Sequence, residues 1–253
     1  MTYNIDYSQY ENKYIFNYSQ YKKSINKNNN FTFTIIFLLI ILLLGLCVFL
    51  KPKDNKLSKF YFVEVDNFQT YDSALKLSQT VKEKTGAGYI YFDKIYHVLA
   101  SFYSKEKDAE KVCENLKNEY ENVQVFCISY PQFVKRKNLS LKQNCSVENL
   151  INVCRKITLQ LEQLSIDFET GKTPFKEAKI LLANYYESFF STFNEFNAQF
   201  NTNSKYNLSK SYAHEIDNSI RKLKESEEQN FSSLLRFELT SIAISIAQFS
   251  SSF

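Results

Sequence analysis

Residues 60–81 read FYFVEVDNFQTYDSALKLSQTV, and this stretch decides the fold of the region around it. Its first six residues are β-branched or aromatic apart from Glu64, which is typical of a β-strand. From residue 71 onward the apolar residues recur near helical spacing, at Ala74, Leu75, Leu77 and Val81. Gly86 ends this pattern, so the stretch predicts a strand followed by a helix.

The residues downstream continue with two strands, a helix and a last strand. We expect strands over 89–92 and 95–103 with a tight Asp93-Lys94 turn, a helix over about 105–119, and a strand over 123–128. The order β-α-β-β-α-β within about 70 residues predicts an α/β (α+β) fold with a ferredoxin-like split βαβ arrangement. An antiparallel sheet with both helices on one face is expected to leave its other face free for a ligand.

These two halves resemble a SPOR (sporulation-related repeat) domain. Residues 60–81 are similar to its opening strand and helix, and residues 95–116, IYHVLASFYSKEKDAEKVCENL, are similar to its second half. The resemblance covers about residues 58–131. It implies a single-pass bacterial cell-envelope protein of cell division or sporulation that binds septal peptidoglycan, especially glycan strands without stem peptides.

The resemblance also implies which residues contact glycan: Tyr61, Glu64, Asn67, Phe68, Tyr96 and His97. Glu64 stands where the family often has Gln, and His97 stands at the usual Arg. Asp66 and Ser101 take positions at which the family usually has Gly. Aromatic faces and a few placed polar groups suit glycan recognition. The alternative is an envelope adapter whose SPOR-like module has lost glycan binding and contacts a protein.

An apolar segment precedes this region. Residues 31–50 read FTFTIIFLLIILLLGLCVFL, without a charge, and 20 helical residues span about 30 Å, the thickness of a bilayer core. We therefore expect one transmembrane helix. Four lysines within 20 residues on either side leave its orientation open. The SPOR resemblance implies a cytoplasmic N-terminus and an extracytoplasmic location for residues 51–253.

Composition divides the rest of the chain. The N-terminal 1–30 is a Tyr- and Asn-rich tail whose tyrosines recur every three or four residues, as in an interfacial helix or a biased disordered tail. The expected parts are therefore the tail (1–30), the transmembrane helix (31–50), a linker (51–57), the SPOR-like domain (58–131), a second linker (132–145) and a helical domain (146–253).

The helical domain shows heptad-like apolar spacing. A seam runs from Leu150 to Phe168, and an aromatic stripe runs from Phe175 to Phe200. A third helix is expected from near Ser209 to the end, with a polar stretch over 224–230 that can interrupt it. About three helices predict an antiparallel bundle or coiled coil for partner binding or homo-oligomerisation, and the aromatic stripe is expected in its core.

Several classes of function are disfavoured. The 253 residues carry 31 basic and 27 acidic side chains, a mixed surface that does not indicate nucleic-acid binding. Four glycines leave no phosphate-cradling loop, and no metal-ligand spacing or catalytic pattern is present, so we expect no cofactor, no metal and no enzyme activity. The thiols of Cys113, Cys127, Cys145 and Cys154 are expected to be buried and free, or paired in disulfides; Cys113 and Cys127 are expected to face the core.

Overall fold

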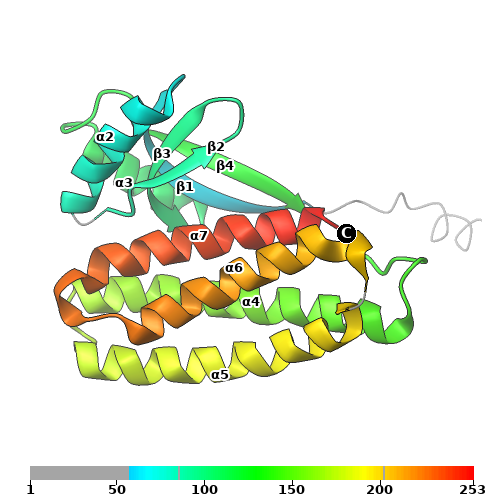
Figure 1. Cartoon of the computed structure of the whole chain (residues 1–253). Helices are drawn as coiled ribbons and strands as arrows, with labels where there is room; N and C mark the ends of the chain where they lie inside the picture. Colours follow the sequence, from blue (N-terminus) through cyan, green and yellow to red (C-terminus); the bar gives the residue numbers. More distant parts are fainter. Residues whose placement is uncertain (1–56, 85, 202) are drawn as a thin grey trace, which may run out of the picture. The chain divides into compact units, whose positions relative to one another are not determined.

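The computed structural model describes residues 57–84, 86–201 and 203–253 (Figure 1). These described residues form one compact unit. The expected tail and membrane helix at 1–50 lie outside the described residues. Within the described ranges, no helix combines the length and the apolar character needed to span a bilayer.

The first half of this unit is a mixed α/β arrangement, as expected. Its elements are β1 (Leu57–Phe68), α2 (Tyr71–Glu83), β2 (Tyr89–Phe92), β3 (Tyr96–Tyr103), α3 (Glu106–Leu116) and β4 (Gln124–Pro131). The strands form one sheet in the order β2-β3-β1-β4, and every neighbouring pair is antiparallel. Each helix therefore connects two strands that have a third strand between them.

The turn between β2 and β3 has three residues, Asp93, Lys94 and Ile95. Lys94 has φ of 84°, a left-handed backbone conformation that three-residue hairpin turns commonly use. This turn brings the end of β2 close to the start of β3, where Phe92 pairs with Tyr96.

Both faces of the sheet are covered, which differs from the free face that we expected. Val63 and Val65 of β1 pack in one core with Ala74 of α2 and Ala109 of α3. The alternate residues of the sheet, Phe60, Phe62, Leu99, Phe102 and Tyr130, belong to a second core that they share with the C-terminal helices. Strand β1 is apolar on both sides, and it is buried on both sides for that reason.

The C-terminal half has four helices instead of about three: α4 (Leu141–Glu169), α5 (Phe175–Phe200), α6 (Asn207–Glu225) and α7 (Phe231–Ser251). The expected third helix is divided because Ser226 adopts an extended backbone and a short 3-10 turn follows at Glu228–Asn230. Helix α4 begins before Ser146, at Leu141, because Ser140 and Gln143 form a capping box.

Helix α7 is the element that joins the two halves. It contacts α4 and α6 on one side and β2, β3 and β4 on the other (Figure 1). Ile242, Ile244 and Ile246 all point into buried surroundings although they lie on different faces of the helix. A helix that is apolar all round must be surrounded by protein. The aromatic stripe of α5 is also in the core, as expected, with Phe189, Phe196 and Phe200 fully buried.

All four described cysteines are free, and Cys113 and Cys154 are buried while Cys127 and Cys145 are exposed. The expectation that Cys127 faces the core was wrong. Its neighbours on β4, Phe126 and Ile128, pack on the core shared with the helices, so Cys127 points to the other side of the strand. Burial raises the pKa of the Cys113 and Cys154 thiols.

This difference predicts selective alkylation. A thiol-specific reagent at neutral pH should label Cys127 and Cys145 of the folded chain within minutes, while Cys113 and Cys154 stay unlabelled until denaturant is added. Mass spectrometry of peptides would measure this in a chain with Cys47 replaced by Ser. Rapid labelling of Cys154 without denaturant would contradict the packing of α4.

Candidate functional site

A polar cluster is centred on the carboxylate of Glu64, whose side chain is buried. Its Oε1 atom lies 2.8 Å from Nδ1 of His97 and accepts a hydrogen bond from Nδ2 of Asn67 at 3.1 Å. Its Oε2 atom accepts a hydrogen bond from Nε2 of Gln124 at 3.0 Å. We call these four residues the Glu64 cluster. Three strands contribute to it, so its geometry depends on the sheet.

The register of the sheet explains why these residues meet. Gln124 of β4 is paired with Glu64, and His97 of β3 is paired with Asn67. The pairing of β1 with β3 shifts on both sides of Glu64, which marks β-bulges. Bulges re-aim side chains and increase local twist. Here they accompany the approach of the Asn67 amide and the His97 imidazole to the same oxygen of Glu64, Oε1.

His97 is enclosed by aromatic rings. Its ring centroid lies 4.5 Å from that of Phe126 and 6.1 Å from that of Tyr91. Its Nε2 atom is buried without a hydrogen-bond partner in the described part of the chain and lies 3.5 Å from the Asp93 carboxylate. His97 is thus held between two carboxylates, and its exposed fraction of 7% leaves little surface for a ligand.

Three aromatic side chains gather at the same end of the sheet. The rings of Phe92 and Tyr96 lie 4.7 Å apart, and those of Tyr71 and Tyr96 lie 5.7 Å apart, between centroids. Phe92 is 58% exposed and Tyr71 is 50% exposed. We call Tyr71, Phe92 and Tyr96 the aromatic platform. Large exposed aromatic groups that touch one another are a usual feature of binding surfaces.

The structure brings some of the six expected residues together and separates others. Glu64, Asn67 and His97 meet in the Glu64 cluster. Phe68 and Tyr96 are paired in the sheet and pack toward α2 and α3. Tyr61 is paired with Tyr103 and Cys127, further along β1. The six residues therefore do not form one open surface on one face of the sheet.

The hydrogen-bonding groups at this end of the sheet are partly used within the Glu64 cluster. The Glu64 carboxylate already accepts two hydrogen bonds and a contact from His97, so little of it remains for a ligand. The exposed amides of Asn67 and Gln124 keep further donor and acceptor capacity. Among the described residues, no group of His, Cys, Asp and Glu has the arrangement of a metal site.

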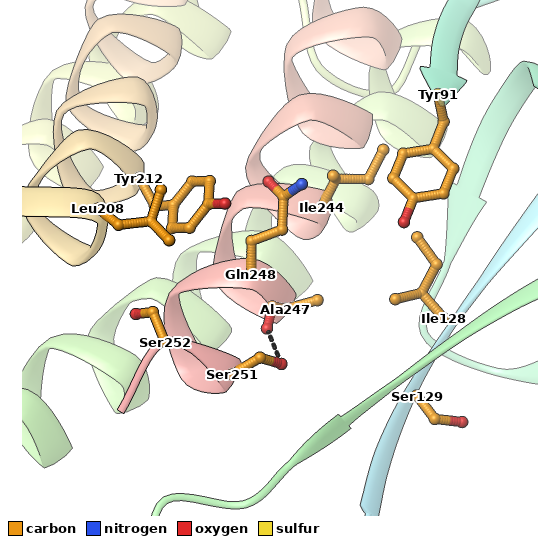
Figure 2. A pocket seen from close by; sticks show the side chains of 10 residues that line it. All are labelled: Tyr91, Ile128, Ser129, Leu208, Tyr212, Ile244, Ala247, Gln248, Ser251 and Ser252. Atoms are coloured by element: carbon orange, nitrogen blue, oxygen red, sulfur yellow. Dashed lines mark hydrogen bonds between the residues drawn. The ribbon is translucent and has the colours of Figure 1, made fainter. Parts of the chain in front are cut away.

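Sequence reasoning missed a cavity of about 320 Å³ between the sheet and helices α6 and α7. We call it the seam cavity; its walls include Tyr91, Ile128, Tyr212, Ile244, Gln248 and Ser251 (Figure 2). It lies on the sheet face that we expected to be free, where α7 covers that face incompletely. Sequence signals for it are weak, because its residues come from four elements and share no spacing.

No family model, no curated protein and no solved structure matches this chain.

Proposed function

We propose that this chain is a membrane-anchored, non-catalytic cell-envelope protein that binds peptidoglycan glycan strands in division or sporulation. The SPOR-like module has a ferredoxin-like fold in this proposal, which the strand order β2-β3-β1-β4 and the antiparallel pairing support. Residues 1–30 are cytoplasmic, residues 31–50 span the membrane, and residues 51–253 face the envelope. The helical half adds a surface for division or sporulation proteins or for a second copy.

The observation that carries the proposal is the aromatic platform of Tyr71, Phe92 and Tyr96, where three rings pack together and two of them are largely exposed. Phe92 and Tyr71 are largely exposed, and sugar rings stack on aromatic rings through their apolar C–H surface. A glycan strand would pass over this end of the sheet, since helix α7 occupies most of the face behind it.

The test is retention of the full chain, in detergent, on purified sacculi with and without amidase treatment. We expect more retention on amidase-treated sacculi, and a Tyr71→Ala/Phe92→Ala double variant should reduce it about tenfold, because each aromatic contact contributes about 0.5–1.5 kcal/mol. Phe190→Ala on α5 is the matched control, because Phe190 is also an exposed ring, 40% exposed. Equal retention on treated and untreated sacculi would refute glycan-strand binding.

The second candidate is an envelope adapter that binds protein. The covered sheet face favours it, because the shared core leaves only the end of the sheet for a glycan. On this alternative, amidase treatment of the sacculi does not change how much of the chain they retain. Crosslinking in intact cells captures one protein through the exposed platform. Loss of that crosslink in the Tyr71→Ala/Phe92→Ala variant, without any effect of amidase, would select the adapter.

A further inference from the structure

The lining of the seam cavity is uncharged. Among the described residues around it are two phenols, one carboxamide and several serine hydroxyls, and none of its side chains is acidic or basic. Its apolar lining includes Ile128 of β4 and Ile244 of α7. A charged ligand in such a cavity would lose hydration without gaining a counter-charge. The cavity therefore suits an uncharged ligand that has both an apolar surface and hydrogen-bonding groups.

The polar groups converge from three elements. Figure 2 shows Tyr91 reaching in from β2, Tyr212 from α6 and Gln248 from α7. Among the residues drawn there, one hydrogen bond is present, from the Ser251 hydroxyl to the Ala247 carbonyl at 2.8 Å. The two phenols and the amide of Gln248 thus do not satisfy one another, and they remain available to a ligand.

The ring of Tyr91 packs against two other rings of the sheet, those of Phe126 and His97. Its ring lies 5.7 Å from that of Phe126 and 6.1 Å from the imidazole of His97, between centroids. Burial, with contributions from Asp93 and Tyr212, raises the pKa of its phenol, so the hydroxyl stays protonated and can both donate and accept. The Glu64 cluster in turn fixes His97, so the wall of the cavity is preorganised by the sheet.

We propose that the seam cavity binds a single uncharged sugar ring. Its volume of about 320 Å³ is at the small end of the range of about 300–1,000 Å³ for ligand pockets, which favours one ring over a chain. The apolar face of the ring would lie on Ile128 and Ile244, and its hydroxyls would meet Tyr91, Tyr212 and Gln248. This site is separate from the aromatic platform, and its ligand need not be peptidoglycan.

The experiment is titration of the full chain by saturation-transfer NMR, in a detergent without a sugar headgroup. The probes are methyl β-glucoside and N-acetylglucosamine as neutral sugars, and glucosamine and glucuronate as charged ones. We expect the neutral sugars to bind and the charged ones to bind at least about tenfold more weakly, because an unpaired charge is disfavoured in an uncharged cavity. Equal binding of the charged sugars, or no binding of the neutral ones, overturns the proposal.

Variants locate the site. Ser251→Trp places a large ring at the exposed rim and should abolish binding, while Tyr212→Phe removes one hydroxyl and should weaken it about two- to tenfold. Tyr186→Phe, a half-buried tyrosine of α5, is the matched control and should bind as the unaltered chain does. Unchanged affinity in Ser251→Trp would place the sugar elsewhere and refute the assignment.

The outcome is independent of the proposed function. The Tyr71→Ala/Phe92→Ala variant should lose retention on sacculi but still bind the neutral sugars. Ser251→Trp should keep retention on sacculi but lose binding of the neutral sugars. If sacculus binding fails in the unaltered chain while neutral sugars still bind, the proposed function falls and the seam cavity stands.

Discussion

A chain that ends after residue 131 will not yield a folded α/β module. In the complete chain, Phe60, Phe62, Leu99, Phe102 and Tyr130 are buried in the core that the sheet shares with the helices. Without helices α4–α7 they would face water. Burial of each such side chain contributes about 1.5–3 kcal/mol, so these five together contribute about 8–15 kcal/mol. That equals the whole stability of a typical domain, about 5–15 kcal/mol.

The measurement is solubility and thermal unfolding of the shortened chain beside the complete one, in the same detergent. We expect aggregation and no cooperative transition. Co-expression of residues 132–253 as a separate chain is the control, because it supplies the missing surface without a covalent link. A shortened chain that unfolds cooperatively would show that the sheet does not need the helices.

Replacement of Glu64 by alanine should destabilise the folded unit by about 3 kcal/mol. The change leaves His97, Asn67 and Gln124 without the carboxylate that they contact, and His97 is buried. Removal of an acceptor that leaves buried hydrogen-bonding groups without a partner typically destabilises by about 1–3 kcal/mol, and by more where the lost group is a carboxylate. For a unit of this size a loss of about 3 kcal/mol corresponds to a fall in Tm of about 6–12 °C.

Two further variants test whether the loss of stability comes from the Glu64 cluster and not from the removal of any glutamate. Glu64→Gln keeps the size of the side chain and one acceptor oxygen, so it should lower the free energy of unfolding clearly less than Glu64→Ala does. Glu121→Ala removes an exposed glutamate near the start of β4, and it should change stability by less than about 0.5 kcal/mol. If Glu64→Ala behaves like Glu121→Ala in calorimetry, the cluster contributes nothing to the fold.

Local pattern was enough to predict the elements of the α/β half, since each strand and helix has its own periodicity. It was also enough for the core positions of α5, where aromatic residues repeat at helical spacing and are buried. The division of the last expected helix was harder to predict. It depends on Ser226 and the short 3-10 turn after it, which follow a lysine-rich segment that is helical in the structure.

The packing of the helices on the sheet was missed, although β1 carries a signal for it. Residues 60–63 are apolar at four consecutive positions, and such a run is typical of a strand that is buried on both faces. The resemblance supplied the six expected glycan residues by their positions along the strands, and strand alternation divides them between the two faces of the sheet. Glu64 and His97 point to the helix side, while Tyr61 and Tyr96 pack toward α2 and α3.

The position of α7 between the sheet and the other helices has a consequence for the order of events during synthesis. Strands β1 and β3 pair early in the chain, but the helix that covers their second face spans residues 231–251. The phenylalanines of the sheet therefore stay uncovered while more than a hundred further residues are added. Contacts between such distant segments slow folding and prolong the exposure of apolar surface. This protein would depend on chaperones, during that interval, more than a domain of the same size whose sheet is covered by neighbouring segments.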